Sequence, residues 1–432
     1  MTRGLKGGLK GGLKTALYVL TGLVVLAGPA AAQNLVIVNA RVIDGKGGVM
    51  ERGSVVVRDG KIAAVSPAAP AAPAGAQRID AQGRTLMPGF IDAHRHIVQG
   101  NGKEWLDKTG AAQLQEFLDA GFTTVLCAIC PDEAVEMRQR IEAGSVRGPR
   151  LLVGSIIPLA RAAVPGGGRG DPARFDTSRP PLRPTTPAGA IPDADTVKAV
   201  ESVAARKFDY IKTVITATPG GPETRTLKLI VDEGKKRGLP TITHAVSVID
   251  TLAAVEAMPA VLVHTPHIGQ LTGDETKRIA GAGIPMTSTL QVFAPHFSTD
   301  NKPLFRDGQP FPWDTISSAG QGPVNARLLW EAGISYGYGT DTTWPPRQSL
   351  ADELRALSLV FSPLDITKIL GQGAARSTLK GDLIGTLDVG KQADLVLIDG
   401  NPLADVNDLL NVVTTIKGGR IVSDRRAAAG RR

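Results

Sequence analysis

Residues 87–96 of the chain read Met87-Pro88-Gly89-Phe90-Ile91-Asp92-Ala93-His94-Arg95-His96. The apolar segment at 90–94 predicts a buried strand, and the two histidines stand at its carboxyl end. Side chains at alternate strand positions lie on the same face, so His94 and His96 are predicted to point in the same direction. Two imidazoles arranged in this manner are typical ligands of a metal ion.

Seven further apolar segments alternate with helical patterns through the middle of the chain. The eight candidate strands are 90–94, 122–126, 151–154, 210–214, 241–244, 261–264, 284–287 and 335–340. The clearest helical pattern covers 223–237 and is followed by Gly238, a typical helix-ending residue. Eight strand–helix units predict an α/β fold, a (β/α)8 TIM barrel with its active site at the carboxyl ends of the strands. The long connections 155–195 and 290–322 are expected to be functional loops.

Four more chemically active residues stand at the carboxyl ends of predicted strands. Together with the first two histidines they form one candidate metal centre: His94, His96, Lys212, His244, His264 and Asp341. The chain has only six histidines, and four of them belong to this set. A single barrel histidine is more often a core or capping residue, but packing does not explain four of them at strand ends.

The two chain ends read as β-structure, with a hairpin turn signal at Asp59-Gly60. Neither end alone can bury a sheet face, so the two are predicted to combine in one small β-sandwich domain. The predicted organisation is a signal peptide at 1–32, a composite β-sandwich from 33–88 and 377–432, and the barrel at 89–376.

The first 32 residues have the pattern of a secretory signal peptide. A basic Gly-Leu-Lys repeat precedes an apolar stretch at 15–28, and three small residues, Ala30, Ala31 and Ala32, stand before Gln33. The apolar stretch is short for a membrane-spanning helix. The protein is therefore predicted to be secreted and periplasmic, with no membrane attachment after cleavage.

Composition and charge indicate an ordinary globular protein without a nucleic-acid partner. The formal net charge of +8 includes Arg3, Lys6, Lys10 and Lys14, so cleavage leaves 8 − 4 = +4 on the mature chain. A basic excess this small is best explained by an ordinary soluble surface, and it also suits an anionic small-molecule substrate. The sequence leaves open whether the chain forms a homo-oligomer.

Cys127 and Cys130 are the only cysteines. Their C-x-x-C spacing occurs in redox and metal sites, but no second pair accompanies it, and Cys127 continues the apolar run at 122–126. The sequence favours packing as buried apolar side chains. A disulfide is permitted by the predicted compartment.

These motifs resemble the amidohydrolase superfamily, closest to its imidazolonepropionase-like and Xaa-Pro dipeptidase (prolidase-like) branch. The resemblance rests on the stretch at 87–96 and on Tyr210-Ile211-Lys212, Thr243-His244-Ala245, Val263-His264 and Gly339-Thr340-Asp341. The tail at 385–397, which includes Gly390-Lys391-Gln392-Ala393-Asp394, is similar to the closing segment of the same enzymes. The chain departs from the common pattern at Thr265, Thr342 and Cys127, which leaves the substrate less defined than the metal site.

The resemblance implies two divalent metal ions, with zinc expected. His94, His96 and Asp341 would hold one ion, and His244 and His264 the second. Lys212 would bridge both as a carboxylated lysine, because an ammonium group has no lone pair to offer a metal. A hydroxide bridging the two ions would attack a substrate carbonyl, and Asp341 would move the proton to the leaving amine.

The substrate is predicted to be small and to carry a carboxylate. The first long loop is rich in arginine, including Arg161 and Arg169, and arginine pairs well with carboxylates. Tyr210, on the same face as Lys212, and His296, in the second long loop, are further candidates for substrate contact. Aromatic residues of the second loop predict an apolar wall. Together these features favour an N-acyl amino acid or an Xaa-Pro dipeptide.

Two alternatives stay open at this point. A cyclic amide or lactone hydrolase, as in imidazolonepropionase, would use one metal ion and would not need Lys212. An exported binding protein without activity could use the same barrel, but loss of a ligand residue would be expected and none is lost.

Overall fold

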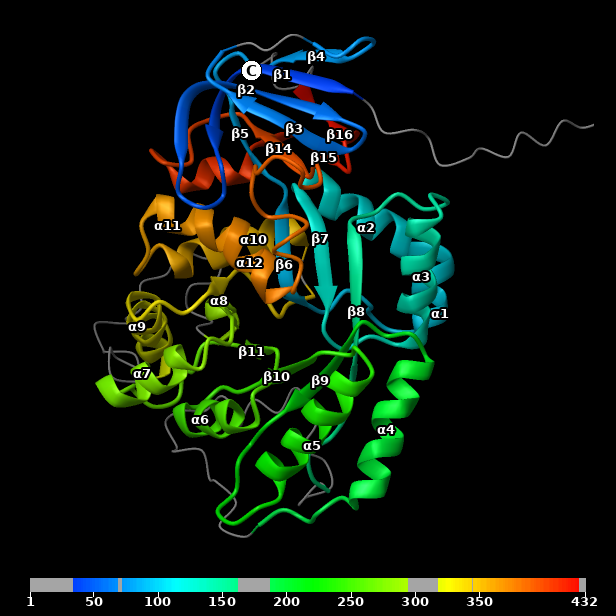
Figure 1. The fold of residues 1–432 in the computed structure, drawn as a ribbon, viewed down its shortest axis with the longest axis vertical. Coiled ribbons are helices and arrows are strands. Elements are labelled where there is room, and N and C mark those ends of the chain that lie inside the picture. The colour runs from blue at the N-terminus through cyan, green and yellow to red at the C-terminus, as the bar shows by residue number, and fades with distance from the viewer. Residues whose placement is uncertain (1–33, 69–71, 162–186, 294–317, 344, 427–432) are drawn as a thin grey trace, which may run out of the picture. The chain divides into compact units, whose positions relative to one another are not determined.

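The computed structural model describes residues 34–68, 72–161, 187–293, 318–343 and 345–426. The described residues belong to one compact unit. Its centre is an eight-stranded parallel sheet, which confirms the predicted (β/α)8 barrel (Figure 1). In spatial order the strands are β6 (Phe90–Arg95), β7 (Phe122–Cys127), β8 (Arg150–Ile156), β9 (Tyr210–Val214), β10 (Thr241–His244), β11 (Val261–Val263), β12 (Met286–Thr287) and β13 (Tyr336–Gly337).

The barrel closes between its first and last strands through the main chain. The N–H of Ala93 donates to the carbonyl of Tyr338 at 3.0 Å, and the carbonyl of His94 accepts from Thr340 at 3.1 Å and from Asp341 at 2.8 Å. The N–H of His96 donates to the carbonyl of Thr342 at 3.3 Å. The residues that follow β13 therefore lie beside the end of β6.

Helices follow the barrel strands in chain order. The first group comprises α1 (Gly102–Glu104), the π-helix Trp105–Thr109, α2 (Gly110–Asp119), α3 (Asp132–Glu142), α4 (Asp193–Ala205) and α5 (Glu223–Lys236). The second comprises α6 (Val248–Ala257), α7 (Gly273–Gly281), α8 (Leu290–Phe293), α9 (Ser318–Glu331), α10 (Pro346–Leu357), α11 (Pro363–Lys368), the π-helix Ile369–Gly373 and α12 (Ala374–Ser377).

The helix predicted at 223–237 is confirmed as α5. Leu227, Ile230 and Val231 are buried, as their helical spacing requires. Gly238 follows the helix with φ of +65°, a conformation that glycine adopts without steric cost.

Both chain ends contribute to a second, mixed sheet, as predicted. Its strands are β1 (Leu35–Ile43), β2 (Val49–Arg58), β3 (Lys61–Ser66), β4 (Gln77–Asp80), β5 (Thr85–Pro88), β14 (Leu395–Ile398), β15 (Val412–Lys417) and β16 (Arg420–Asp424). β5 pairs with β14, so the N-terminal and C-terminal strands form one continuous sheet rather than two separate ones. A 3-10 helix at Val406–Leu410 lies between β14 and β15.

The second sheet is joined to the barrel by buried polar contacts. Arg150 on β8 forms an ion pair with Asp394 at 2.8 Å, and its guanidinium also donates to Thr124 of β7 at 2.9 Å. The hydroxyl of Thr415 donates to the carbonyl of Leu118 at 2.6 Å. These contacts fix the tail of the chain against the first strands of the barrel.

The lower interior of the barrel is filled by a cluster of buried side chains: Leu126, Ala128, Leu152, Tyr210, Ile242, Val261 and Val263. These positions alternate along their strands with residues that face the helices. Because Lys212 is two residues after Tyr210 on β9, it lies on the same inner face, closer to the carboxyl end.

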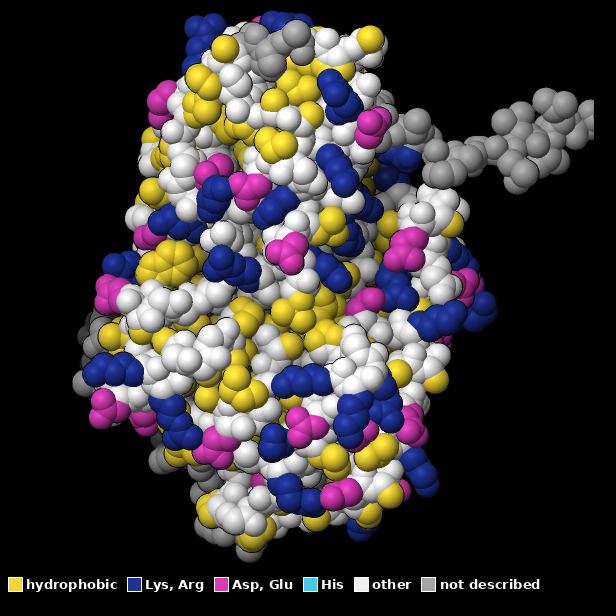
Figure 2. Space-filling view, in the orientation of Figure 1, with side chains coloured by type: hydrophobic (Ala, Val, Ile, Leu, Met, Phe, Trp, Pro, Cys, Tyr) yellow, Lys and Arg dark blue, Asp and Glu magenta, His cyan; other side chains and the backbone are white. Residues whose placement is uncertain are grey.

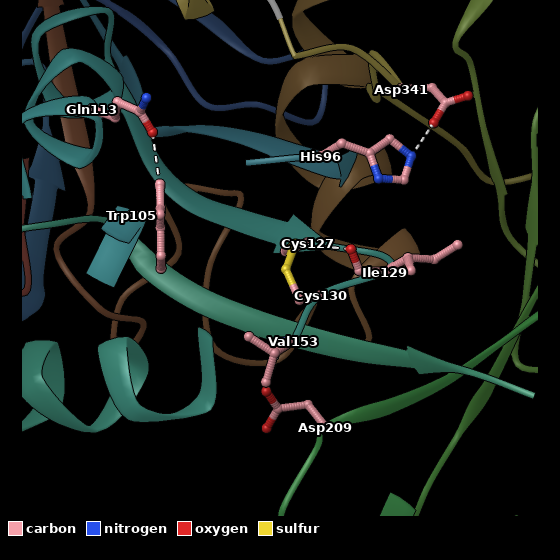
Figure 3. The surroundings of a disulfide bond; sticks show 9 residues. All are labelled: His96, Trp105, Gln113, Cys127, Ile129, Cys130, Val153, Asp209 and Asp341. Atoms are coloured by element: carbon pink, nitrogen blue, oxygen red, sulfur yellow. Dashed lines mark hydrogen bonds and ion pairs between the residues drawn. A yellow bond between two sulfur atoms is a disulfide. The ribbon is translucent and has the colours of Figure 1, made fainter. Parts of the chain in front are cut away.

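Cys127 and Cys130 form a disulfide at the end of β7 (Figure 3). The predicted packing as buried side chains is confirmed, and the disulfide, which the sequence permitted but did not favour, joins them. Both residues are buried in the apolar layer between the sheet and the helices. The loop after Cys127 reverses direction within three residues, which brings the two sulfur atoms together, and strand periodicity does not reveal that turn.

The surface carries both signs of charge. On the face drawn in Figure 2, lysine and arginine side chains lie among aspartate and glutamate side chains. Over the residues that the structure describes, no helix combines the length and the apolar character needed to cross a bilayer.

Candidate metal centre

Asp341 contacts both histidines of the first strand. Its Oδ1 lies 3.0 Å from Nε2 of His94. The same oxygen lies 2.7 Å from Nε2 of His96, a contact drawn in Figure 3. Asp341 is 245 or more positions from both histidines in sequence, and it meets them because the barrel closes between β6 and β13. The structure therefore brings together the three residues predicted to hold the first ion.

The other two histidines of the candidate set also lie near this group. Nε2 of His264 is 3.9 Å from Oδ2 of Asp341, and its ring centroid is 5.0 Å from that of His94. The rings of His244 and His264 have centroids 4.2 Å apart. The candidate ligand atoms of His94, His264 and Asp341 all lie within 4.8 Å of one another, a spacing that suits a shared cation.

Lys212 is fully buried on β9 and faces these imidazoles. Burial, and next to it the positive charge of Lys212, lower the pKa of His94 to about 3. The same two causes, in the same order, hold the pKa of His244 well below its usual value. Lys212 lies on the inner face of β9, and its charge acts on both histidines.

The donor set fits a divalent transition-metal ion. Desolvated imidazoles stay neutral, and a neutral imidazole has the lone pair that a metal needs. Burial raises the pKa of Asp341, but its close contact with His94 and the hydrogen bonds from His94 and His96 outweigh burial and hold the pKa well below its usual range. Nδ1 of His94 is buried without a hydrogen-bond partner among the described residues. Lys212 fits only if it is modified, because an ammonium would repel a cation.

Two of the candidate ligands have a left-handed backbone. The φ angles are +78° at His264 and +54° at Asp341, in a region that residues other than glycine rarely adopt. Such strain persists only where the surrounding structure enforces it, and it occurs most often at functional sites. The strand ends are bent here so that the two side chains turn toward His94.

Hydrogen bonds behind the ligands include residues that sequence reasoning missed. The Oγ1 of Thr289 lies 2.7 Å from Nδ1 of His264, which fixes the orientation of that ring. Thr289 follows β12 by two residues, and nothing in its local pattern distinguishes it from an ordinary loop threonine. Its φ of +48° appears only in the structure.

Glu353 on α10 is a second residue that the sequence did not reveal. Its buried carboxylate accepts the N–H groups of Leu290 and Gln291 at 3.0 and 2.9 Å, at the start of α8. Burial raises the pKa of Glu353 to about 7. A glutamate on an amphipathic helix is normally assigned to the exposed face, so no sequence signal marks it.

The predicted substrate residues do not gather at the centre. Tyr210 is buried in the lower interior, where its hydroxyl donates to the carbonyl of Thr378 at 2.5 Å, so the expectation that it contacts substrate needs correction. Arg161 is exposed, and its N–H donates to the carbonyl of Gly189. Arg169 and His296 lie outside the described residues, as do the side chains of the expected aromatic wall. His267 is buried beside Thr265.

Ile156 supplies an apolar surface next to Lys212. The two residues are register partners on neighbouring parallel strands, so their side chains share the inner face. Ile156 is the last residue of β8 and is 45% exposed, whereas Lys212 is fully buried. The barrel mouth therefore presents an exposed isoleucine on the β8 side of the lysine.

Comparisons with known proteins identify relatives of the chain. The pattern of the Amidohydrolase family matches residues 85–422. The imidazolonepropionase of Geobacillus sp. (strain WCH70) is 23% identical over 405 residues, which cover 87% of this chain and 91% of that protein.

Solved structures share the fold. A putative prolidase from Bifidobacterium longum superimposes with a TM-score of 0.71 at 23% identity, over 92% of this chain and 97% of that one. A Xaa-Pro dipeptidase with methionine bound in its active site gives a TM-score of 0.71 at 19% identity, over 90% and 99% of the two chains.

The depressed pKa of His94 predicts a measurable pH effect on stability. Between about pH 3 and the usual value of 6.5, the unfolded chain binds a proton at this position and the folded chain does not. The free energy of unfolding of the metal-free protein should therefore decrease as pH falls below 6.5. In His94→Asn this slope should be shallower, by up to about 1.4 kcal/mol per pH unit.

Urea unfolding with a chelator present, at several pH values between about 5 and 7.5, measures this slope. The wild-type protein is the reference, since all other titrating groups are shared. Equal slopes in the two proteins would show that His94 is protonated in the folded state.

Proposed function

The chain belongs to the amidohydrolase family, and on that premise we propose that it is a binuclear metal hydrolase that cleaves an amide or peptide bond. The proposed substrate is small and carries a carboxylate, as an N-acyl amino acid or an Xaa-Pro dipeptide does. One observation carries the proposal: side chains on or just after β6, β9, β10, β11 and β13 lie together toward the carboxyl ends of the barrel strands. That end of a TIM barrel is where catalytic residues are found.

Members of this family generally bind divalent metals, and the proposed ions here are two zinc ions. His94, His96 and Asp341 would hold one, His244 and His264 the other, and a carboxylated Lys212 both. Carboxylation would replace a buried cation by an anion, which removes the repulsion between Lys212 and the metals. When bound, the metals lower the pKa of a water toward ~7 and polarise the carbonyl under attack.

Asp341 is the proposed general acid–base. Its Oδ1 is engaged by His94 and His96, whereas its Oδ2 has only the more distant His264 nearby among the described contacts. The carboxylate is partly exposed, at 18%, so a water or a substrate amide can reach it. Asp341 would accept the proton of the attacking water and deliver it to the leaving amine.

Ile156 supports an apolar group on the substrate. Ile156 is exposed on the inner face of the barrel mouth. A substrate that covers this side chain removes apolar surface from water, which stabilises the complex. Since Ile156 stands beside Lys212, the apolar group would lie next to the scissile amide. This supports an N-acyl chain or an apolar first residue of a dipeptide.

A cyclic amide or lactone hydrolase is the second candidate function. The curated relative named imidazolonepropionase favours it, and the solved structures named prolidase and Xaa-Pro dipeptidase favour the first candidate. The buried Lys212, whose charge acts on His94, His244 and His264, supports the two-metal amide hydrolase. A binding protein without activity is disfavoured, because the chain belongs to a family of hydrolases.

Export to the periplasm is also part of the proposal. The signal-like segment 1–32 lies outside the described residues, so its support comes from the sequence. The disulfide between Cys127 and Cys130 adds independent support, because disulfides persist in oxidising compartments and are rare in the cytosol.

The metal proposal predicts about two equivalents of zinc per purified chain. Removal of the metals by a chelator should abolish hydrolysis in a screen of N-acyl amino acids and Xaa-Pro dipeptides, and added zinc should restore it. Asp341→Asn should lower kcat about 10²- to 10⁴-fold, because the variant carries no proton acceptor. The exposed Asp274→Asn is the matched control and should keep full activity. A metal-free protein with undiminished activity would contradict the proposal.

The apolar contact predicts a change of preference in Ile156→Asp. Its kcat/KM for substrates with an apolar acyl group should fall about 10- to 200-fold, while small acyl groups should be affected less. Val389→Asp replaces another exposed apolar residue, in the segment before β14, and should change neither value. The same loss for all acyl groups would show that Ile156 does not select the substrate.

The export proposal predicts where the mature chain begins. N-terminal sequencing of protein from the periplasmic fraction should start at Gln33, and mass spectrometry should find Cys127 and Cys130 joined. Full-length protein that stays in the cytosolic fraction with free thiols would argue against export.

A further inference from the structure

A buried polar cluster lies directly behind the candidate metal ligands. It consists of Asp92, Arg95 and Thr340, which are each 0% or 1% exposed. Arg95 stands between His94 and His96 in the chain, and Thr340 directly precedes Asp341. Each member is thus within two residues of a candidate ligand, while none is a candidate ligand itself.

The three side chains bond to one another across the closure of the barrel. The hydroxyl of Thr340 donates to Oδ2 of Asp92 at 2.8 Å and accepts from Nη1 of Arg95 at 3.0 Å. Arg95 and Asp92 also form an ion pair at 3.4 Å. The N–H groups of His94 and Thr340 both point at Oδ1 of Asp92, at 3.2 and 3.3 Å.

An irregularity in β6 makes this cluster possible. Asp92 is the register partner of Val125, and Arg95 is that of Cys127, so β6 has one residue more than β7 over this interval. The extra residue brings Asp92 and Arg95, three positions apart in sequence, onto the same face. In a regular strand the two side chains would lie on opposite faces.

The cluster is electrically balanced and closely packed. The guanidinium of Arg95 lies over the ring of Phe117, 5.0 Å from its centroid, on the side of α2. A buried charge pair needs such compensation, because either charge alone would be strongly unfavourable in the interior. The arrangement therefore links the position of Arg95 to that of Thr340.

We propose that Asp92 and Arg95, acting through Thr340, are positioning residues for the metal centre, which itself rests on the proposed function. They tie the end of β6 to the segment after β13 and so hold Asp341, in its left-handed conformation, against His94 and His96. Without the Thr340 hydroxyl, the backbone bonds at the closure remain but the side-chain link between the two strand ends is lost. The spacing between Asp341 and the two histidines would then be less well defined, and a metal ion would bind less tightly.

The sharpest test compares two substitutions at one position. Thr340→Val keeps the shape of threonine and removes the hydroxyl, and its zinc affinity should fall on the order of 10- to 100-fold. Thr340→Ser keeps the hydroxyl, and its affinity should stay close to that of the wild type. Competition with a chromophoric chelator measures zinc affinity without any substrate. Arg95→Met should weaken zinc binding at least as much as Thr340→Val.

Thr123→Val is the matched control. Thr123 is fully buried on β7, and its hydroxyl has no hydrogen-bond partner among the described residues, so the exchange should leave zinc affinity unchanged. Urea unfolding of each metal-free variant separates a loss of metal affinity from a loss of stability. The visible spectrum of the Co²⁺-loaded protein, which responds to ligand geometry, should change in Thr340→Val and stay constant in Thr123→Val.

The possible outcomes have different consequences. If the Val and Ser variants at position 340 bind zinc equally, whether tightly or weakly, the hydroxyl link has no positioning role and the inference is overturned. A Thr340→Val protein that is less stable without metal but binds zinc normally overturns it as well. If the wild type itself binds no metal, the proposed function fails, and this inference fails with it.

Discussion

The candidate centre depends on a junction where the carbonyl of His94 accepts the N–H groups of Thr340 and Asp341. β12 and β13 are only two residues long, so hydrogen bonds between paired strands contribute little to the closing edge of the sheet. The main-chain hydrogen bonds of the residues after β13 connect this edge to β6. Because His94, His96 and Asp341 come from the two sides of this junction, the spacing of their side chains is set by the same bonds that close the barrel.

The electrostatics of the centre follow from its place in the barrel. The apolar layer beneath Lys212 seals the lower interior, and the lysine and His264 are consequently removed from water. Neutral imidazoles tolerate such burial, whereas an ammonium tolerates it poorly. Asp341 is the anion in contact with His94 and His96, and its pKa is held low by that contact. A site with this charge balance favours the binding of metal cations only when Lys212 no longer carries its positive charge.

Much of the fold could be predicted because apolar strand segments and helical spacing of apolar residues alternate along this chain. Each of the eight barrel strands overlaps one of the predicted segments, and histidine, lysine or aspartate stands on or near the ends of five of them. The missed features have other causes. The disulfide arises from a turn after Cys127, the bond to Thr289 from a left-handed backbone, and the pairing of Asp92 with Arg95 from an extra residue in β6. The sequence places Tyr210 on the correct face of its strand. The alternation of side chains does not show how deep in the barrel a residue lies, so it did not reveal that the Tyr210 hydroxyl bonds to Thr378.

The pairing of β5 with β14 has a consequence for the order of assembly. Residues 85–88 are register partners of residues 395–398, about three hundred positions later in the chain. A polypeptide that emerges from its amino end must therefore keep the apolar edge of β5 unpaired until nearly the whole chain is available. Contacts of such long range make folding slow, and they leave the nascent amino-terminal sheet open to self-association during that interval.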